Sequence, residues 1–162
     1  MKKLKQPDDS LKVLVERVSL LDEKLGAILF QLPPRWRLNL ERLKDFLNML
    51  PGDYRYAFEF RDPSWFESSV YEALARCGAA FCIYDFKGCL SAKEVTADFI
   101  YFRFHGPKPD AYRGKYDRQF LAGWAEAFSD WSRKNIEIFC YFDNDEAGFA
   151  VHNALELKSI LT

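Results

Sequence analysis

Five short apolar segments alternate with helical or link-length segments along this chain of 162 residues. The apolar segments have the length and composition of strands and cover residues 26–32, 56–60, 79–86, 98–106 and 136–145. Each intervening segment returns the chain to the same end of a sheet, which requires parallel pairing. Because the strands are apolar at nearly every position, both sheet faces must be covered. The sequence therefore predicts an α/β fold, either an open doubly wound sheet or part of a (β/α) barrel.

Helical spacing of apolar residues predicts the elements between these strands. The expected helices cover residues 11–25, 40–50, 64–77, 120–131 and 150–161. Asp62 precedes Pro63 and is expected to cap the helix that starts there. We expect residues 1–10 to be frayed and residues 1–162 to form a single domain, because no linker or low-complexity segment interrupts the pattern.

Composition narrows the class of protein. The formal net charge is −1, which argues against a generally basic surface for nucleic acid. The four cysteines form no C-x-x-C pair, which is typical of reduced, mostly buried thiols. The sequence shows neither an apolar leader nor an apolar run of membrane-spanning length. We therefore expect a soluble protein of the cytoplasm with no membrane partner.

The segment YAFEFRDPSWF places unlike side chains on the two faces of one strand. Tyr56, Phe58 and Phe60 alternate with Ala57, Glu59 and Arg61. If the aromatic face meets helices, the other face points to a barrel interior. The same phase turns inward Ala27, Leu29 and Gln31 of the first strand, Phe81, Ile83 and Asp85 of the third, and Tyr101, Arg103 and His105 of the fourth. Each set becomes more polar toward the carboxyl end of its strand, where α/β proteins place their sites.

This polar ring suggests chemistry at the carboxyl ends of the strands. Arg61 and Arg103 have the two-pronged geometry that grips a carboxylate or phosphate. Glu59 and His105 are the candidate acid/base groups, and Gln31 and Asp85 would complete the ring. The alternative is a satisfied ion-pair network with a purely structural role, because buried charges need partners.

Two loops add polar groups to the same end. YRGKY carries Arg113 and Lys115 around a glycine, a pattern that suggests an anion clamp or simply a solvated loop. FDNDEAG places Asp143 and Asn144 after the last strand. A cation shared by Glu59, Asp85 and Asp143 is an alternative, but the calcium-loop pattern is not matched. We therefore assign no metal ligand, and the sequence does not identify a cofactor.

Five blocks resemble the YecE-like family, a domain of unknown function (number 72). They are KLGAILFQLPP, YAFEFRDPSWF, EVTADFIYFRFHG, YRGKY and YFDNDEAGFAVHNAL, between about residues 18 and 161. The resemblance implies a TIM-type (β/α) barrel and carries no established activity. Members of that family open with about three further β/α units, and a complete barrel needs about 250 residues. The resemblance therefore implies the C-terminal portion only, a partial barrel of about five parallel strands with its N-terminal strands missing.

These observations give one functional hypothesis and one alternative. The hypothesis is an anionic ligand, phosphate-containing or nucleic-acid-like, at the carboxyl ends of the strands, with hydrolysis as its enzymatic form. The alternative is a non-catalytic binding or assembly module whose charges are structural. A partial barrel would expose sheet edges and apolar surface, so we expect self-association or a missing N-terminal segment as partner.

Overall fold

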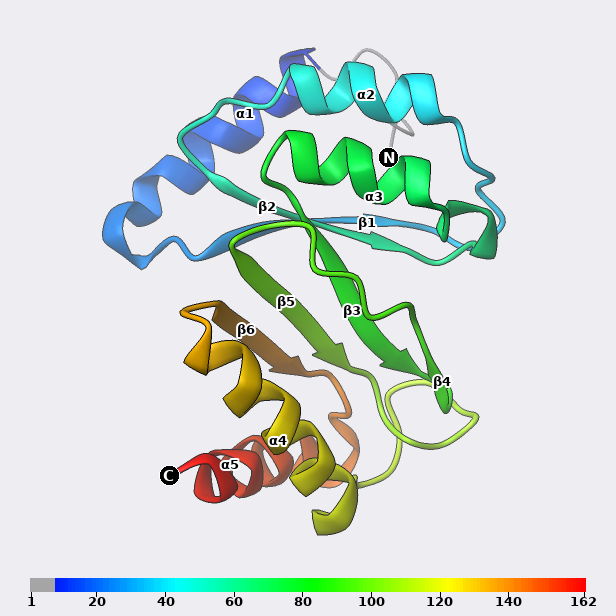
Figure 1. Cartoon of the computed structure of the whole chain (residues 1–162), viewed down its shortest axis with the longest axis vertical. Helices are drawn as coiled ribbons and strands as arrows, with labels where there is room; N and C mark the ends of the chain where they lie inside the picture. The colour runs from blue at the N-terminus through cyan, green and yellow to red at the C-terminus, as the bar shows by residue number, and fades with distance from the viewer. Residues whose placement is uncertain (1–7) are drawn as a thin grey trace. The chain divides into compact units, whose positions relative to one another are not determined.

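A computed structural model describes residues 8–162 (Figure 1). The described chain forms two compact units, one reaching to Phe81 and including Glu94–Ala97, the other comprising Cys82–Lys93 and Asp98–Thr162. The first helix begins at Asp8, so the expected fraying of residues 8–10 stays a prediction, and residues 1–7 lie outside the described part of the chain. The expectation of a single domain stays a prediction.

The first unit contains two complete parallel strands and the start of a third. Its elements are α1 (Asp8–Val18), the 3₁₀ helix η1 (Ser19–Lys24), β1 (Ala27–Leu32), α2 (Leu40–Asn48), β2 (Arg55–Phe60), the 3₁₀ turn η2 (Pro63–Trp65), α3 (Ser68–Arg76) and the first residues of β3 (Ala80–Phe86). β1 pairs with β2 from Ala27–Arg55 to Leu32–Phe60. β2 pairs with β3 through Ala57–Ala80 and Phe58–Phe81.

The second unit continues β3 and adds the remaining strands. Its elements are β4 (Cys89–Leu90), β5 (Phe99–Phe104), α4 (Arg118–Arg133), β6 (Glu137–Phe142), the 3₁₀ turn η3 (Glu146–Gly148) and α5 (Phe149–Leu161). β5 runs parallel to β3 and to β6, while the short β4 is antiparallel to β3. The predicted α/β class with parallel strands is confirmed. The sequence missed β4, which is only two residues long.

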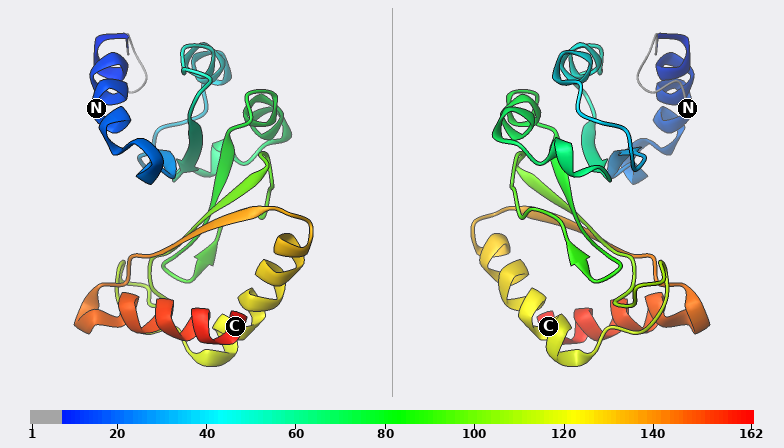
Figure 2. Two further views of the ribbon diagram at one scale, coloured as in Figure 1. Left: turned by 90° about the vertical axis from the view of Figure 1, so that its left-hand side faces the viewer. Right: turned by 90° about the vertical axis from the view of Figure 1, so that its right-hand side faces the viewer.

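Aromatic side chains join the strands of the first unit to its helices. α2 and α3 lie on one side of β1 and β2 (Figures 1 and 2). Phe46 of α2 packs edge-on against Phe30, with ring centroids 5.0 Å apart, and it also contacts Phe58. Phe60 stacks on Trp65 with centroids 4.7 Å apart. The prediction that the even-numbered aromatics of β2 face helices is therefore confirmed, and Glu59 points to the other side.

The same arrangement recurs in the second unit. Phe102 of β5 lies 4.5 Å from Trp124 of α4 and 5.7 Å from Phe128, between ring centroids. Phe104 also contacts Trp124. The even-numbered side chains of β5 thus face α4, as predicted, and Arg103 lies on the opposite face.

The predicted orientation of β3 is wrong by one residue. Phe81 is the register partner of Phe58 and its ring contacts Tyr71 of α3 at 5.3 Å, so it faces the helices. Asp85 is the register partner of Phe104 and shares the face that α4 covers. Nearly every residue of β3 is buried, so its sequence has no polar side to reveal the phase.

Within residues 8–162, no helix is long and apolar enough to cross a membrane.

A buried threonine completes the backbone hydrogen bonding at the start of β3. The Thr96 hydroxyl donates to the Ala79 carbonyl at 2.7 Å and accepts from the Phe81 amide at 2.8 Å. We predict that Thr96→Val, which keeps the size but removes both bonds, lowers the free energy of unfolding by about 2 kcal/mol. Thr96→Ser, which keeps the hydroxyl, should cost clearly less. Urea unfolding measures both, and equal stabilities of Thr96→Val and the unaltered protein would contradict this role.

Candidate functional site

An aspartate after β6 joins two cationic or basic side chains at the end of β5. The Asp143 carboxylate oxygen Oδ2 lies 2.9 Å from Arg103 Nε and 3.4 Å from His105 Nδ1. The Asp143 amide donates to the Phe104 carbonyl at 2.7 Å, which fixes the carboxylate beside β5. We call Arg103, His105 and Asp143 the Asp143 cluster. The sequence predicted all three as site residues, and the structure brings them together.

The members of the Asp143 cluster differ in their access to solvent. His105 is completely buried, whereas 17% of the Arg103 side chain and 26% of the Asp143 side chain are exposed. The His105 ring lies against the rings of Phe86 at 5.5 Å and Tyr112 at 5.6 Å. A ligand from solvent therefore meets Arg103 and Asp143 first, while the imidazole lies beneath an aromatic cover.

The loop after β5 folds tightly and supplies that cover. Gly106 has φ +102°, and a Cβ there would lie 2.4 Å from the Arg113 carbonyl oxygen, so only glycine fits. The Tyr112 amide donates to the His105 carbonyl at 2.7 Å. The Gly106 amide donates to the Tyr116 hydroxyl at 2.8 Å. These contacts hold Tyr112 against the imidazole.

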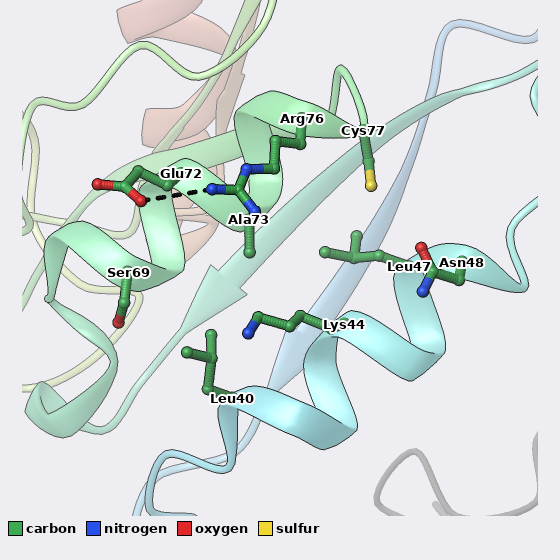
Figure 3. A pocket seen from close by; sticks show the side chains of 9 residues that line it. All are labelled: Leu40, Lys44, Leu47, Asn48, Ser69, Glu72, Ala73, Arg76 and Cys77. Atoms are coloured by element: carbon green, nitrogen blue, oxygen red, sulfur yellow. Dashed lines mark ion pairs between the residues drawn. The ribbon is translucent and has the colours of Figure 1, made fainter.

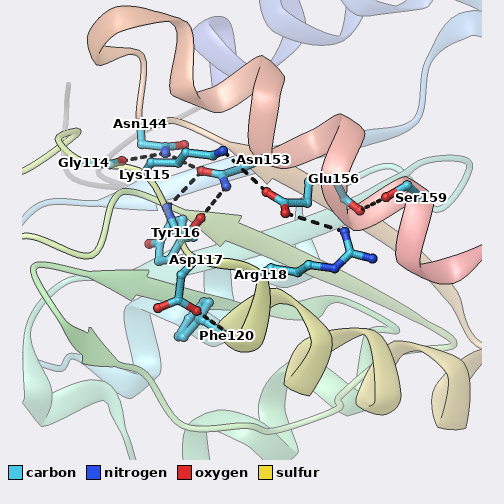
Figure 4. Close-up of polar contacts among 10 residues, drawn as sticks. All are labelled: Gly114, Lys115, Tyr116, Asp117, Arg118, Phe120, Asn144, Asn153, Glu156 and Ser159. Atoms are coloured by element: carbon cyan, nitrogen blue, oxygen red, sulfur yellow. Dashed lines mark hydrogen bonds and ion pairs between the residues drawn. The ribbon is translucent and has the colours of Figure 1, made fainter.

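Two buried asparagines fasten this loop to the end of β6 (Figure 4). Asn144 Nδ2 donates to the Gly114 carbonyl at 2.8 Å and to Asn153 Oδ1 at 2.9 Å. Asn153 bonds both the amide and the carbonyl of Tyr116. Asn144 thus has a structural task, and its ligand-binding role stays a prediction. Asn153, which lies within α5, was not among the predicted site residues.

The cations of the YRGKY loop pair with surface carboxylates. Arg113 lies 3.8 Å from Asp110, and Lys115 lies 3.7 Å from Glu156. Figure 4 shows Lys115 beside Glu156 of α5. Both cations remain about half exposed. The anion clamp that the sequence suggested for Arg113 and Lys115 stays a prediction.

Asp85 lies apart from the Arg103 face. Its buried carboxylate accepts a hydrogen bond from the Tyr116 hydroxyl on the side that α4 covers. The prediction that Asp85 shares a face with Arg103 is therefore wrong, because the side chains of β3 alternate in the opposite phase to the predicted one. Among the described residues, no group of three or more His, Cys, Asp or Glu side chains is placed to hold a metal ion.

In the first unit, Glu59 and Arg61 form a buried ion pair. The Arg61 Nε contacts Glu59 Oε1, and the two side chains are 6% and 0% exposed. Gln31 is the register partner of Glu59, so it lies on the same face. These three predicted site residues are neighbours, as expected. That they share one site with the Asp143 cluster stays a prediction.

The predicted cap at Asp62 is confirmed. Its carboxylate accepts from the Ser64 amide at 3.1 Å and from the Ser64 hydroxyl at 2.7 Å, and these bonds hold the pKa of Asp62 below its ordinary value. The Trp65 indole donates to the Trp36 carbonyl at 2.6 Å and is almost fully buried. Trp65 is thus a packing anchor.

A groove between α2 and α3 is a feature that the sequence did not indicate (Figure 3). It has a volume of about 270 Å³ and is lined by Leu40, Lys44, Leu47, Asn48, Ser69, Glu72, Ala73, Arg76 and Cys77. Lys44 pairs with Glu41 at 2.9 Å, and Arg76 lies 3.9 Å from Glu72. Its charges are thus balanced locally.

Polar groups at the carboxyl ends of parallel strands define this protein as an α/β protein with a candidate binding site at that edge. The chain belongs to the family described as "Protein of unknown function DUF72", whose family model matches residues 1–162. The predicted family is therefore confirmed, whereas the restriction to its C-terminal portion is not borne out.

Relatives of known sequence or structure are similar to this chain over most of its length. The UPF0759 protein YunF of Bacillus subtilis (strain 168) is 26% identical over 170 residues, covering 88% of this chain and 60% of the relative. The crystal structure of a DUF72 family protein (TM1631) from Thermotoga maritima MSB8 matches with a TM-score of 0.87 at 28% identity, over 99% of this chain and 67% of that chain. A DUF72 family protein (EF0366) from Enterococcus faecalis V583 has a TM-score of 0.82 at 22% identity, over 95% and 66%. The chain thus spans about 60% of its curated relative.

The environment of Asp85 predicts a pH effect on stability. Burial raises the pKa of Asp85 above its ordinary value of 3.8, against the lowering effects of the Tyr116 hydrogen bond and the His105 charge. As the pH rises, the Asp85 carboxyl loses its proton in the unfolded chain near pH 3.8, and in the folded protein only at a higher pH. The stabilising contribution of Asp85 is therefore present below pH 3.8 and is lost as the pH rises through the raised pKa of the folded protein. Asp85→Asn does not titrate.

We therefore predict that Asp85→Asn gains stability relative to the unaltered protein as the pH rises from about 4 to about 7. Urea unfolding of both proteins across this range measures the difference, in which the titrations of other groups cancel. Parallel pH profiles would contradict the assignment.

Proposed function

We propose that the protein binds an anionic, phosphate-containing ligand through Arg103, with Asp143 and His105 completing the site. The observation that carries this proposal is the ion pair between Arg103 Nε and Asp143 Oδ2 at 2.9 Å. The Arg103 side chain is held by this pair and is still partly exposed to solvent. A guanidinium has five N–H donors in a planar fork. An arginine oriented through Nε is prepared to receive an anion with little loss of side-chain freedom.

The position of Arg103 supports the same conclusion. It is the fifth residue of β5, near the carboxyl end, and its register partner Tyr141 lies at the same level of β6. Ligands of α/β proteins bind outside the carboxyl ends of their parallel strands. The predicted ligand residues of the same unit, Arg113, Lys115 and Asn144, remain candidates for further contacts.

Hydrolysis is the enzymatic extension of this proposal. Asp143 beside His105 Nδ1 would orient the imidazole, as a carboxylate does for a general base. Because His105 is completely buried, Tyr112 would have to move before a substrate could reach it. Glu59, the other predicted acid/base group, is engaged with Arg61. We therefore propose ligand binding as the primary function and hydrolysis as its secondary extension.

The alternative is a non-catalytic module whose charges are structural. The burial of Glu59 and Arg61 favours it, because a paired charge inside a protein is costly to separate and stabilises one arrangement. On this alternative, Arg103 and Asp143 would respond to no ligand.

Titration calorimetry with inorganic phosphate tests the proposal. We expect saturable binding to the unaltered protein and a loss of about tenfold in affinity, ~1.4 kcal/mol, in Arg103→Gln. The control is Arg133→Gln, because Arg133 is an exposed arginine of α4 that pairs with Asp130. The control should bind as the unaltered protein does.

Two results would overturn the proposal. One is no binding of phosphate or pyrophosphate by the unaltered protein. The other is equal affinity in Arg103→Gln and the control. The same titration with a short oligonucleotide tests the nucleic-acid-like ligand that the sequence suggested. The affinity of the protein for the oligonucleotide should fall in Arg103→Gln as the affinity for phosphate does.

A further inference from the structure

We infer that the ligand carries a flat aromatic ring, which stacks on Tyr141 while its phosphate group meets Arg103. This inference rests on the proposed function and names the chemical class of its ligand, an aryl phosphate or a nucleotide. It is carried by the place of Tyr141 in the sheet, by the rings behind it and by its exposure.

Register places the tyrosine beside the arginine. Tyr141 of β6 is the direct partner of Arg103 of β5 in a parallel ladder. Residues directly opposite each other project to the same face, and neighbouring strands lie about 4.8 Å apart. A ring lying on Tyr141 would therefore hold a substituent within reach of the guanidinium.

Buried aromatic rings support the tyrosine from behind. Tyr141 stacks on Tyr101 with centroids 5.0 Å apart and planes inclined by 26°. Tyr101 is only 7% exposed, and it stacks in turn on Phe139 at 6.4 Å. Burial raises the pKa of the Tyr101 phenol, which keeps the supporting ring neutral. The supporting ring of Tyr101 is thus buried and neutral.

Tyr141 nevertheless remains open to solvent, with 42% of the residue exposed. Scattered exposed apolar residues are ordinary on protein surfaces. Tyr141 differs because its backing is a stacked aromatic row and its ladder neighbour is the arginine of the Asp143 cluster. Large rigid aromatic side chains bind flat ligands at a low entropic cost.

The ring and the phosphate make separable contributions. Calorimetry with phenyl phosphate, glycerol phosphate and a nucleoside monophosphate compares an aryl ring, no ring and a base. We expect both ring-bearing ligands to bind at least about tenfold tighter than glycerol phosphate, in line with stacking of a base on an aromatic side chain. A hexose phosphate, whose ring is not flat, should gain less.

Substitutions assign the gain to Tyr141. Tyr141→Ala should abolish the preference for ring-bearing ligands and leave the affinity for glycerol phosphate within about twofold of the unaltered protein. Tyr141→Phe, which keeps the ring, should retain the preference, and the control Tyr54→Ala in the first unit should change neither.

The outcomes separate the two proposals. Glycerol phosphate binding that depends on Arg103, with no gain from a ring, would overturn this inference and leave the proposed function standing. A ring preference that survives Tyr141→Ala would also overturn it. No binding of any phosphate would overturn both.

Discussion

The ion pair between Asp143 and Arg103 organises the polar end of the second unit. One carboxylate oxygen contacts Arg103 Nε at 2.9 Å and His105 Nδ1 at 3.4 Å. The backbone beside this carboxylate is held by the Asp143 amide, which donates to the Phe104 carbonyl, and the side chain of the neighbouring Asn144 fastens the loop after β5. Without a carboxylate partner, a partly buried arginine would lose hydration with no interaction to compensate for it. The orientation of the arginine, and with it the proposed anion site, therefore depends on Asp143.

The parallel pairing of β5 and β6 places this ion pair and an aromatic side chain next to each other on one face of the sheet. Alternation sends the even-numbered aromatics of β5 to α4 and leaves Arg103 on the other face, beside Tyr141. The same register stacks Tyr141 on Tyr101. Charge and aromatic platform are thus adjacent because one strand pairing places both. A one-residue slip would send these side chains to the helix side.

Sequence reasoning succeeded where the two faces of an element differ chemically. In β2 and β5 a charged residue, Glu59 or Arg103, stands between two aromatic residues, so their phase could be predicted. The Asp62 cap depends on Ser64, which is only two positions away. Sequence reasoning failed for Asp85, because β3 is apolar on both faces and only its ladder fixes the phase. Asn153 was missed because its partner Tyr116 lies 37 positions away, beyond any local pattern.

The most direct measurement of the central claim is a double-mutant cycle on Arg103 and Asp143, using Arg103→Gln and Asp143→Asn. Unfolding free energies of the two single variants, the double variant and the unaltered protein give the coupling between the side chains. The account predicts a favourable coupling of about 1 kcal/mol or more, since contacting charges in a partly buried pair are not independent. Additive effects, with a coupling of about zero, would contradict it.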